Sequence, residues 1–372
     1  MLFTRSVRAA LATAGLAVIV SGCGPNAFGW GFNRSGQVGD GTTKERRAPT
    51  PIGSDTDWSA VNAGGGRTCG VRGTGTLWCW GYNTFGVLGD GTATDRHVPT
   101  RIGTAGDWSA ISLGSLHTCG LRGTGTLRCW GRNGSGPVGD GTTTNRLVPT
   151  RIGTAGDWSA ITAGGSHTCG VRGTGTLWCW GANSHGELGD GTTGDRLVPT
   201  RIGTASDWSA VSAGYRHTCG LRATGSLWCW GDNPDGRLGD GTTSDRLVPT
   251  NIGAAGDWTA VSAGGDHTCG LRGTGIPWCW GFNGEGQVGD GTTTSRLVPT
   301  TVGTAGDWSA ISAGFSHTCG LRGTGALWCW GYNDSGQLGD GSTTNRRVPI
   351  RVGTATGWSK ISGGASHTVG LE

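Results

Sequence analysis

The sequence of 372 residues is poor in several residue types, with one methionine, three tyrosines and only 15 % charged residues. Residues that form helices well are scarce, which excludes a helical bundle. The 77 glycines have no three-residue period, so a collagen-like chain is excluded, and the 19 tryptophans exclude a disordered one. What is present, glycine and tryptophan, indicates short strands, tight turns and aromatic packing.

The charge is almost balanced. Without Arg5 and Arg8, which belong to the leader described below, the chain carries 27 basic and 25 acidic residues. This is no electrostatic footprint for nucleic acid, and no nucleic-acid partner is expected. The chain has no Walker A motif, no zinc-type cluster and no G-x-S-x-G elbow, so we expect no metal, no cofactor and no catalytic residue.

Residues 1–22 have the pattern of an export signal. Arg5 and Arg8 precede an apolar stretch, 9–20, which as a helix rises only about 18 Å and is too short to span a bilayer. Val20-Ser21-Gly22-Cys23 resembles the lipobox of bacterial lipoproteins, which implies cleavage before Cys23 and a lipid on that cysteine. The alternative is a secretory signal with an incidental cysteine. If Cys23 carries a lipid, residues 23–26 are the lipid anchor and a short tether. The residue after the lipidated cysteine influences the sorting of lipoproteins in Gram-negative cells. It is Gly24 here and not Asp, which by resemblance to that rule favours the outer membrane if the cell is Gram-negative.

One unit of 50 residues repeats along the rest of the chain. The segment Cys-Trp-Gly at 79–81 returns at 129, 179, 229, 279 and 329 without any slip in register. All 19 tryptophans fall into three columns, aligned with Trp58, Trp78 and Trp80, and Arg128 fills one gap. Residues 27–372 are therefore one repeat domain.

Each unit contains three β-rich runs, of which WSAIS, HTCGLR and LWCWG are examples. Gly73-Thr74-Gly75 predicts a three-residue hairpin loop between the last two runs. Pro49 and its six equivalents predict a short outer strand or edge segment. Three or four strands per unit, repeated seven times, predict an all-β fold, a seven-bladed β-propeller.

The pattern G-x-x-H-[ST], then a hairpin, then WG-x-N-x-x-G-x-[LV]-G is seen in residues 163–191. It resembles the repeat of the regulator of chromosome condensation (RCC1) family, and the resemblance covers residues 27–372. It implies a seven-bladed propeller. Eukaryotic members include a nuclear exchange factor for a small GTPase, and some secreted bacterial members bind and inhibit β-lactamases. Exchange activity is not expected here, because export removes the chain from the cytosol and no insertion interrupts the units. A rigid platform that grips another protein is expected instead.

Twelve cysteines form six pairs that are symmetric about the hairpin loops. Directly opposite residues in a non-hydrogen-bonded pair have Cα atoms about 4.5 Å apart, within disulfide range. Buried thiols or a metal site are the alternatives, and two thiolates supply only half of a tetrahedral shell. The split seventh unit has Val369 and Gly29 in the cysteine columns, as expected if the N- and C-terminal strands pair and close the ring. We predict six disulfides, and hence an oxidising compartment, from Cys69–Cys79, Cys119–Cys129, Cys169–Cys179, Cys219–Cys229, Cys269–Cys279 and Cys319–Cys329.

Several polar residues recur in almost every unit. His117 returns in five later units, with Arg67 in its place in the first, while Asn33, Asp40 and Arg46 each occur seven times. A catalytic group is needed once, so these columns predict structural roles: Asx turns and a ring of Asp–Arg ion pairs. Calcium binding by the Gly-Asp-Gly-Thr-Thr segment is a weaker alternative, because one Asp per turn supplies too few oxygens.

The repeat varies at the loop positions before HTCGLR and after LWCWG, which should share the face opposite the hairpins. All three tyrosines and four of the six phenylalanines lie there. Aromatic and arginine side chains are the usual anchors of interfaces, whereas the alternative is that these positions are merely unconstrained. Tyr82, Tyr215, Phe315 and Tyr332 are the expected anchors. The whole predicted binding face consists of Phe32, Tyr82, Phe85, Leu116, Arg132, Tyr215, Arg216, Asp266, Phe282, Phe315 and Tyr332, with Arg132 and Arg216 supplying polar contacts.

The sequence therefore predicts a monomeric, lipid-anchored binding platform with no catalytic activity, whose partner is an extracellular or periplasmic protein or glycan. A protein inhibitor of an extracytoplasmic enzyme is the main alternative. A polysaccharide-acting enzyme is a further one and would need a carboxylate pair outside the repeat, for which Asp232, Asp235, Asp266 and Glu285 are the candidates. Only residues 24–26 separate Cys23 from the first strand, and three residues span only about 10 Å. The hairpin face should therefore lie close to the membrane.

Overall fold

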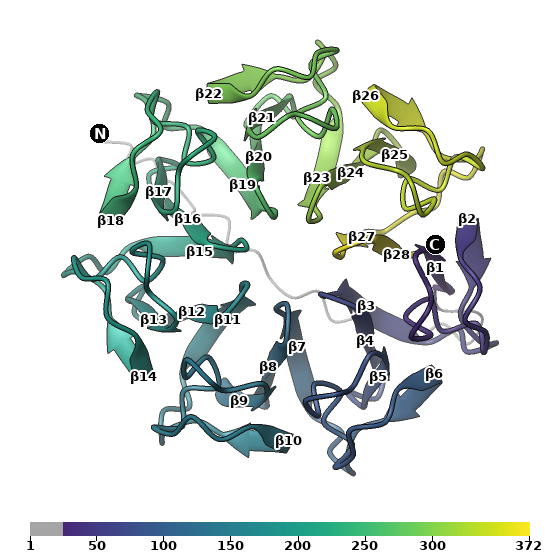
Figure 1. Ribbon diagram of the computed structural model, residues 1–372, viewed down its shortest axis with the longest axis horizontal. Helices are drawn as coiled ribbons and strands as arrows, with labels where there is room; N and C mark the ends of the chain where they lie inside the picture. Colours follow the sequence, from purple (N-terminus) through teal and green to yellow (C-terminus); the bar gives the residue numbers. More distant parts are fainter. Residues whose placement is uncertain (1–24) are drawn as a thin grey trace, which may run out of the picture.

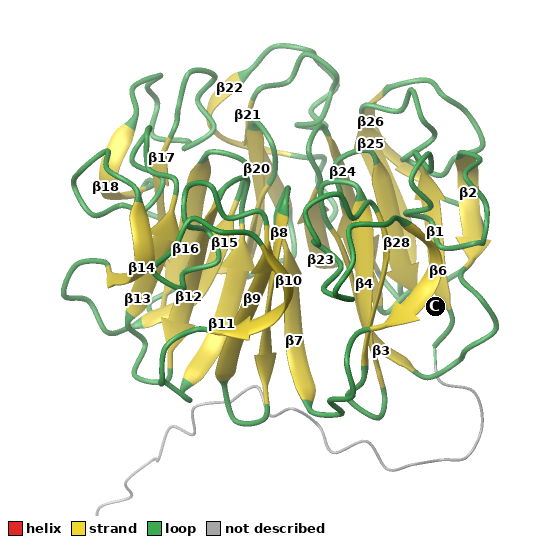
Figure 2. Cartoon of the chain, turned by 60° about the horizontal axis from the view of Figure 1, so that its bottom comes forward, coloured by secondary structure: helices red, strands yellow, loops and turns green. Residues whose placement is uncertain are grey.

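The computed structural model of the chain describes residues 25–372; the predicted signal peptide and Cys23 lie outside these residues. The described residues form 28 strands and no helix, in seven four-stranded sheets. Figure 1 shows the sheets arranged as blades around a central axis, and Figure 2 shows their strands running between two faces that are covered by loops. The predicted seven-bladed β-propeller is confirmed.

Every blade has the same order of strands from the axis outwards. The strands nearest the axis are β3 (Trp58–Ala63), β7 (Trp108–Leu113), β11 (Trp158–Ala163), β15 (Trp208–Ala213), β19 (Trp258–Ala263), β23 (Trp308–Ala313) and β27 (Lys360–Gly363). The second strands are β4 (Arg67–Arg72), β8 (His117–Arg122), β12 (His167–Arg172), β16 (His217–Arg222), β20 (His267–Arg272), β24 (His317–Arg322) and β28 (His367–Leu371).

The third strands are β5 (Leu77–Gly81), β9 (Thr126–Gly131), β13 (Leu177–Gly181), β17 (Leu227–Gly231), β21 (Pro277–Gly281), β25 (Ala326–Gly331) and β1 (Ala27–Gly31). The outermost strands are β6 (Arg96–Arg101), β10 (Arg146–Arg151), β14 (Arg196–Arg201), β18 (Arg246–Asn251), β22 (Arg296–Thr301), β26 (Arg346–Arg351) and β2 (Arg46–Pro51). We number the blades that begin with β3, β7, β11, β15, β19 and β23 as 1 to 6, and blade 7 combines β27, β28, β1 and β2.

The second and third strands of each blade form the predicted hairpin. In blade 1 the amide of Arg72 donates to the carbonyl of Thr76 at 3.0 Å, and Gly75 turns the loop with a φ of +73°. Cys69 lies directly opposite Cys79, with Cα atoms 4.1 Å apart, and the two are bonded. All six predicted disulfides are present, each within one blade.

Blade 7 joins the two ends of the described chain. Strand β1 pairs with β28 antiparallel, and Gly29 lies opposite Val369 at the position of the cysteines. Beyond these strands the amide of Asn26 donates to the carbonyl of Glu372 at 2.8 Å. The predicted closure of the ring by these two strands is confirmed.

The core lies between the blades, because each sheet packs its apolar side chains against the next sheet. In blade 1 the rings of Trp58 and Trp80 meet edge to face at 5.7 Å, and both are buried. Each such ring buries roughly 150–250 Å². Trp80 also lies against Gly39 of blade 7, whose φ is +84° and where a Cβ atom would stand 2.4 Å from Nε1 of Trp80. Only glycine fits there, and this contact recurs at the other interfaces.

Candidate binding face

A belt of buried histidines lies between the blades and connects neighbouring blades at six of the seven interfaces. Nε2 of His117 in blade 2 lies 2.8 Å from Oγ1 of Thr168 in blade 3, and that hydroxyl donates to the carbonyl of Pro137 at 2.8 Å. Because the threonine proton is used, the histidine must donate from Nε2. The same contact is made by His167, His217, His267, His317 and His367.

This belt is structural, in agreement with the prediction from its repetition. Burial, aided by the charges of Arg67 and His167, lowers the pKa of His117 to about 3. Burial also lowers the pKa of His167 to about 4. The imidazoles are therefore neutral at physiological pH and have no access to solvent. Neither property suits a general acid or base.

Arg67 takes the place of histidine between blades 1 and 2. Its Nε and Nη2 atoms donate to Oγ1 of Thr118 at 3.1 and 3.0 Å, and Nη1 donates to the carbonyl of Ser115 at 2.9 Å. Burial lowers the pKa of Arg67 to about 9. The guanidinium thus reaches the same threonine column as the histidines do.

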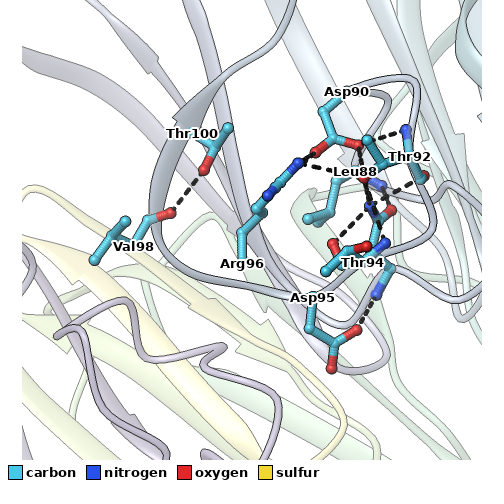
Figure 3. Close-up of polar contacts among 9 residues, drawn as sticks. Leu88, Asp90, Thr92, Thr94, Asp95, Arg96, Val98 and Thr100 are labelled. Atoms are coloured by element: carbon cyan, nitrogen blue, oxygen red, sulfur yellow. Dashed lines mark hydrogen bonds and ion pairs between the residues drawn. The ribbon is translucent and has the colours of Figure 1, made fainter.

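The Asn, Asp and Arg columns organise the loop between the third and fourth strands (Figure 3). Oδ1 of Asp90 accepts from the amide and hydroxyl of Thr92, and Oδ2 accepts from Nε of Arg96 at 2.7 Å. Nδ2 of Asn83 donates to Oδ1 of Asp90 at 3.1 Å. Partial burial raises the pKa of Asp90, but these hydrogen bonds outweigh it and lower the pKa below its usual value.

The predicted Asp–Arg pairs occur in all seven blades. Each pair lies within one loop, so the pairs surround the propeller without linking one blade to the next. Donors of the protein occupy both oxygens of the Asp carboxylate, which leaves little of it for a calcium ion.

The variable positions gather on one face, which we call the loop face; the opposite face carries the hairpin loops. Backbone hydrogen bonds join the two variable loops of each blade: the amide of Tyr82 donates to the carbonyl of Gly66, and the amide of Asp232 donates to the carbonyl of Arg216, both at 3.0 Å. The chain at Asn26 lies at the other end of the strands, on the hairpin face.

Tyr215 and Phe315 lie at the centre of the loop face. They come from blades 4 and 6, and their rings meet edge to face with centroids 5.2 Å apart. They line a cavity of about 120 Å³ around the propeller axis, whose other lining residues are mostly glycine and alanine. Tyr215 is 39 % and Phe315 38 % exposed, and the guanidinium of Arg216 lies 5.5 Å from the Tyr215 ring.

The other predicted binding residues are dispersed around this centre. Arg132 of blade 2 lies over the ring of Phe85 of blade 1 at 5.5 Å, which forms a second cationic and aromatic pair. The hydroxyl of Tyr332 donates to Asp334 at 3.0 Å. Tyr332 is half-buried, and so are Phe32, Tyr82, Leu116 and Phe282. The structure therefore brings Tyr215, Phe315 and Arg216 together and leaves Tyr82 and Tyr332 apart from one another in blades 1 and 6.

Three of the four carboxylates that were candidates for catalysis belong to a charged cluster on the same face. The guanidinium of buried Arg237 contacts Asp232 at 3.0 Å, Asp235 at 3.3 Å and Asp266 at 2.8 Å. Burial raises the pKa of Asp266, although the charge of Arg237 opposes this shift. Glu285 accepts a hydrogen bond from Asn345 at 2.6 Å. Asp266 is thus part of an ion-pair cluster rather than a free contact residue.

Three residues of this cluster, Arg237, His185 and Asp245, were not predicted from the sequence. Arg237 stands in a column that holds Gln, Val, Pro or Glu in other units. His185 and Asp245 lie 60 residues apart, yet Nδ1 of His185 is 3.2 Å from Oδ2 of Asp245. Arg237 and His185 depart from the repeat at positions on the loop face, which was the available signal, whereas Asp245 shares its residue type with Asp95 and Asp195.

The geometry and topology define the class of protein. It is a seven-bladed propeller with a disulfide in six of its blades, and the residues that vary between repeats lie on one face. The chain matches the RCC1-like domain over residues 26–319 and the regulator of chromosome condensation (RCC1) repeat over 308–337 and 324–371. The protein belongs to the RCC1-like domain family. No curated protein matches the chain in sequence.

Solved structures share this fold. Human WBSCR16 is 22 % identical with a TM-score of 0.84, and the match covers 93 % of this chain and 98 % of that one. Prp20p of Saccharomyces cerevisiae is 18 % identical with a TM-score of 0.84, over 94 % and 92 %. Yeast RCC1 (Prp20) bound to Kap60 is 17 % identical with a TM-score of 0.85, over 99 % and 96 %. At these identities the likeness concerns the fold.

The fold is that of a protein-interaction platform, and the six disulfides indicate an oxidising, extracytoplasmic environment. Residues 25–372 include no helix with the length and apolar character needed to cross a membrane.

Proposed function

We propose that this protein is an exported, lipid-anchored interaction platform without catalytic activity, which binds another protein through the centre of its loop face. The lipobox-like segment that ends at Cys23 and the six disulfides support export. Arg237 pairs with three of the four carboxylates that were candidates for catalysis, and the belt histidines are sealed between blades, which supports the absence of catalysis.

The observation that carries the proposal is the exposed pair of Tyr215 and Phe315. In the other five blades this column holds Gly, Ser or Ala, so the fold itself does not require a large ring here. Two exposed aromatic rings in contact, with Arg216 beside them, form the kind of rigid anchor that buries much area at little cost in entropy.

The orientation is consistent with such a role. Asn26, three residues from Cys23, lies on the hairpin face, so a lipid on Cys23 would direct that face towards the membrane. The loop face would then point away from the bilayer and stay accessible to a partner.

The test compares two pairs of substitutions in the full chain. Tyr215→Ser with Phe315→Ala reproduces the residues found at Ser115 and Ala365, so the fold should be kept. Thr74→Ala with Thr274→Ala, in exposed hairpin loops, is the matched control. Immobilised protein is incubated with cell-envelope extract, and captured proteins are quantified by mass spectrometry.

We expect a specific protein whose capture falls at least tenfold with the aromatic double variant and is unchanged with the hairpin control. Equal capture by both variants, or loss with the hairpin variant alone, would show that the binding face is wrong. Retention of envelope polysaccharide in place of a protein would contradict the proposed class of partner.

A further inference from the structure

The charged cluster on the loop face contains a group of potential metal ligands at the boundary of blades 3 and 4. His185 belongs to the loop between β13 and β14, and Asp232 and Asp245 belong to the loop between β17 and β18. One ligand atom from each of the three lies within 4.8 Å of the others. Among residues 25–372 this is the one such group of three.

The separations fit a small divalent ion. Nδ1 of His185 is 3.2 Å from Oδ2 of Asp245 and 3.5 Å from Oδ1 of Asp232. Ligand atoms at about 2.1 Å from a tetrahedral zinc ion are about 3.4 Å from one another. The two separations from His185 are thus close to the spacing that such an ion requires, and the two carboxylates lie within 4.8 Å of each other.

Asp232 provides a second observation that points to a ligand. Its side chain is more than nine-tenths buried, and Oδ2 is held by Arg237 at 3.0 Å. No residue in the described chain donates a hydrogen bond to Oδ1, which faces His185. Nδ1 of His185 can donate only one proton, and Asp245 is the nearer acceptor. This oxygen of a largely buried side chain therefore has no protein donor and is left for a cation.

The surroundings carry an excess of negative charge. Five carboxylates gather here, those of Glu187, Asp232, Asp235, Asp245 and Asp266, against the guanidinium groups of Arg237 and Arg216. Glu187 is buried and accepts the amide of His185 at 2.8 Å, which fixes the loop that carries the histidine. Such a field attracts a cation and disfavours an anion.

We propose that His185, Asp232 and Asp245 form a binding site for a divalent transition-metal ion of the zinc type. The imidazole nitrogen favours such an ion over calcium or magnesium, which prefer oxygen ligands. His185 and Asp245 are partly exposed, so a fourth position opens towards solvent on the loop face. The ion would join blades 3 and 4. This proposal does not rest on the proposed function.

The repeat itself supplies conservative variants for the test. His185→Ser installs the residue found at Ser35, Ser135 and Ser335, and Asp245→Asn installs the residue found at Asn145 and Asn345. In those blades the asparagine still caps the loop, as Asn145 does for the amide of Asn133 at 2.9 Å. Both variants should therefore fold.

Asp95→Asn is the matched control. Asp95 is aligned with Asp245 and accepts a hydrogen bond from the amide of Asn83 at 2.8 Å. The residue aligned with His185 at that blade boundary is Ser35, so no histidine accompanies Asp95. Tag-free full chain is stripped with a chelator, and Zn²⁺ binding is measured by equilibrium dialysis, with circular dichroism to verify folding.

We expect one zinc ion per chain for the unmodified protein and for Asp95→Asn, and at least tenfold weaker binding for His185→Ser and for Asp245→Asn. Zinc should also raise the melting temperature of the first two proteins only. Absence of zinc binding by the unmodified protein, or equal binding by all four, would overturn the proposal. Displacement of zinc by an equal concentration of Ca²⁺ would overturn the class of ion.

Discussion

His367 and Thr68 lie 299 residues apart in sequence, and Nε2 of His367 lies 3.0 Å from Oγ1 of Thr68. The hydroxyl of Thr68 in turn donates to the carbonyl of Gln37 at 2.8 Å, and Nε1 of Trp80 donates to that same carbonyl at 3.1 Å. Blade 7 is therefore joined to blade 1 by the same side-chain contacts that join other blades, in addition to the strand pairing within blade 7.

Thr68→Val should destabilise the propeller. Valine keeps the shape of threonine but removes the hydroxyl, so the buried Nε2 of His367 loses its acceptor. Leaving a buried donor unsatisfied costs about 1–3 kcal/mol. Denaturant unfolding of the full chain should show this loss, whereas Thr74→Val, in an exposed hairpin loop, should unfold as the unmodified protein does. Equal stability of the two variants would contradict the role of the belt.

The protein should lose stability in mild acid. Burial lowers the pKa of His117, His267 and His367 to about 3 and that of His167 and His317 to about 4. In the unfolded chain the histidines bind protons below about pH 6.5. Unfolding therefore takes up protons between pH 6.5 and the folded pKa values, and stability, complete above pH 6.5, falls as the pH decreases through this window.

Each buried histidine contributes about 1.4 kcal/mol per pH unit within that window. The carboxylates of the Asp40 column affect stability only at a lower pH than the histidines do. Partial burial raises the pKa of Asp40, but hydrogen bonds and the charge of Arg46 outweigh it and hold this pKa below 3.8. Their contribution is lost only as the pH falls below about 4. Melting temperatures between pH 8 and 4.5 thus report on the histidines. A constant melting temperature from pH 7 to 5 would show that the belt histidines are not buried and neutral.

Removing one disulfide should destabilise the protein without unfolding it. Cys169→Val with Cys179→Gly copies the residues that blade 7 uses at these positions, Val369 and Gly29. A bridge that closes a loop of this length contributes roughly 2–3 kcal/mol in the chain-entropy model. Denaturant midpoints under non-reducing conditions should fall accordingly. Mass spectrometry of the unmodified, exported protein should detect no free thiol among the twelve repeat cysteines, and twelve free thiols would refute the bridges.

Cys23→Ser should release the protein from the membrane fraction. Cys23 is the predicted lipidation site, and serine cannot carry the thioether-linked lipid. Cell fractionation followed by immunoblotting would measure the distribution of both forms. Retention of the serine variant in the membrane fraction would disprove the lipid anchor.

The fold could be predicted from the sequence because its period never slips. The strands, hairpin loops and cysteine pairs recur at the same places in the 50-residue unit, so one correct interpretation, such as that of Cys69 and Cys79, holds for all six uninterrupted units. The closure through Gly29 and Val369 followed from the same columns.

The charged cluster could not be predicted in the same way. Its contacts join residues of adjacent blades at positions where the repeat varies, as between His185 and Asp245, and periodicity says nothing about such positions. The carboxylates Asp232 and Asp266 were identified as exceptions, but the guanidinium of Arg237 between them was not. For the histidine column, repetition indicated a structural role, and only the structure identifies threonine as its partner.

The near-identity of the interfaces has a consequence for how this gene can change. Gly39 receives Trp80 just as Gly139 receives Trp180, so the blades present nearly the same central contact to their neighbours. Unequal recombination between two such units would add or remove one whole blade and create no foreign junction. Variants with an altered number of blades should be accessible to selection in single steps.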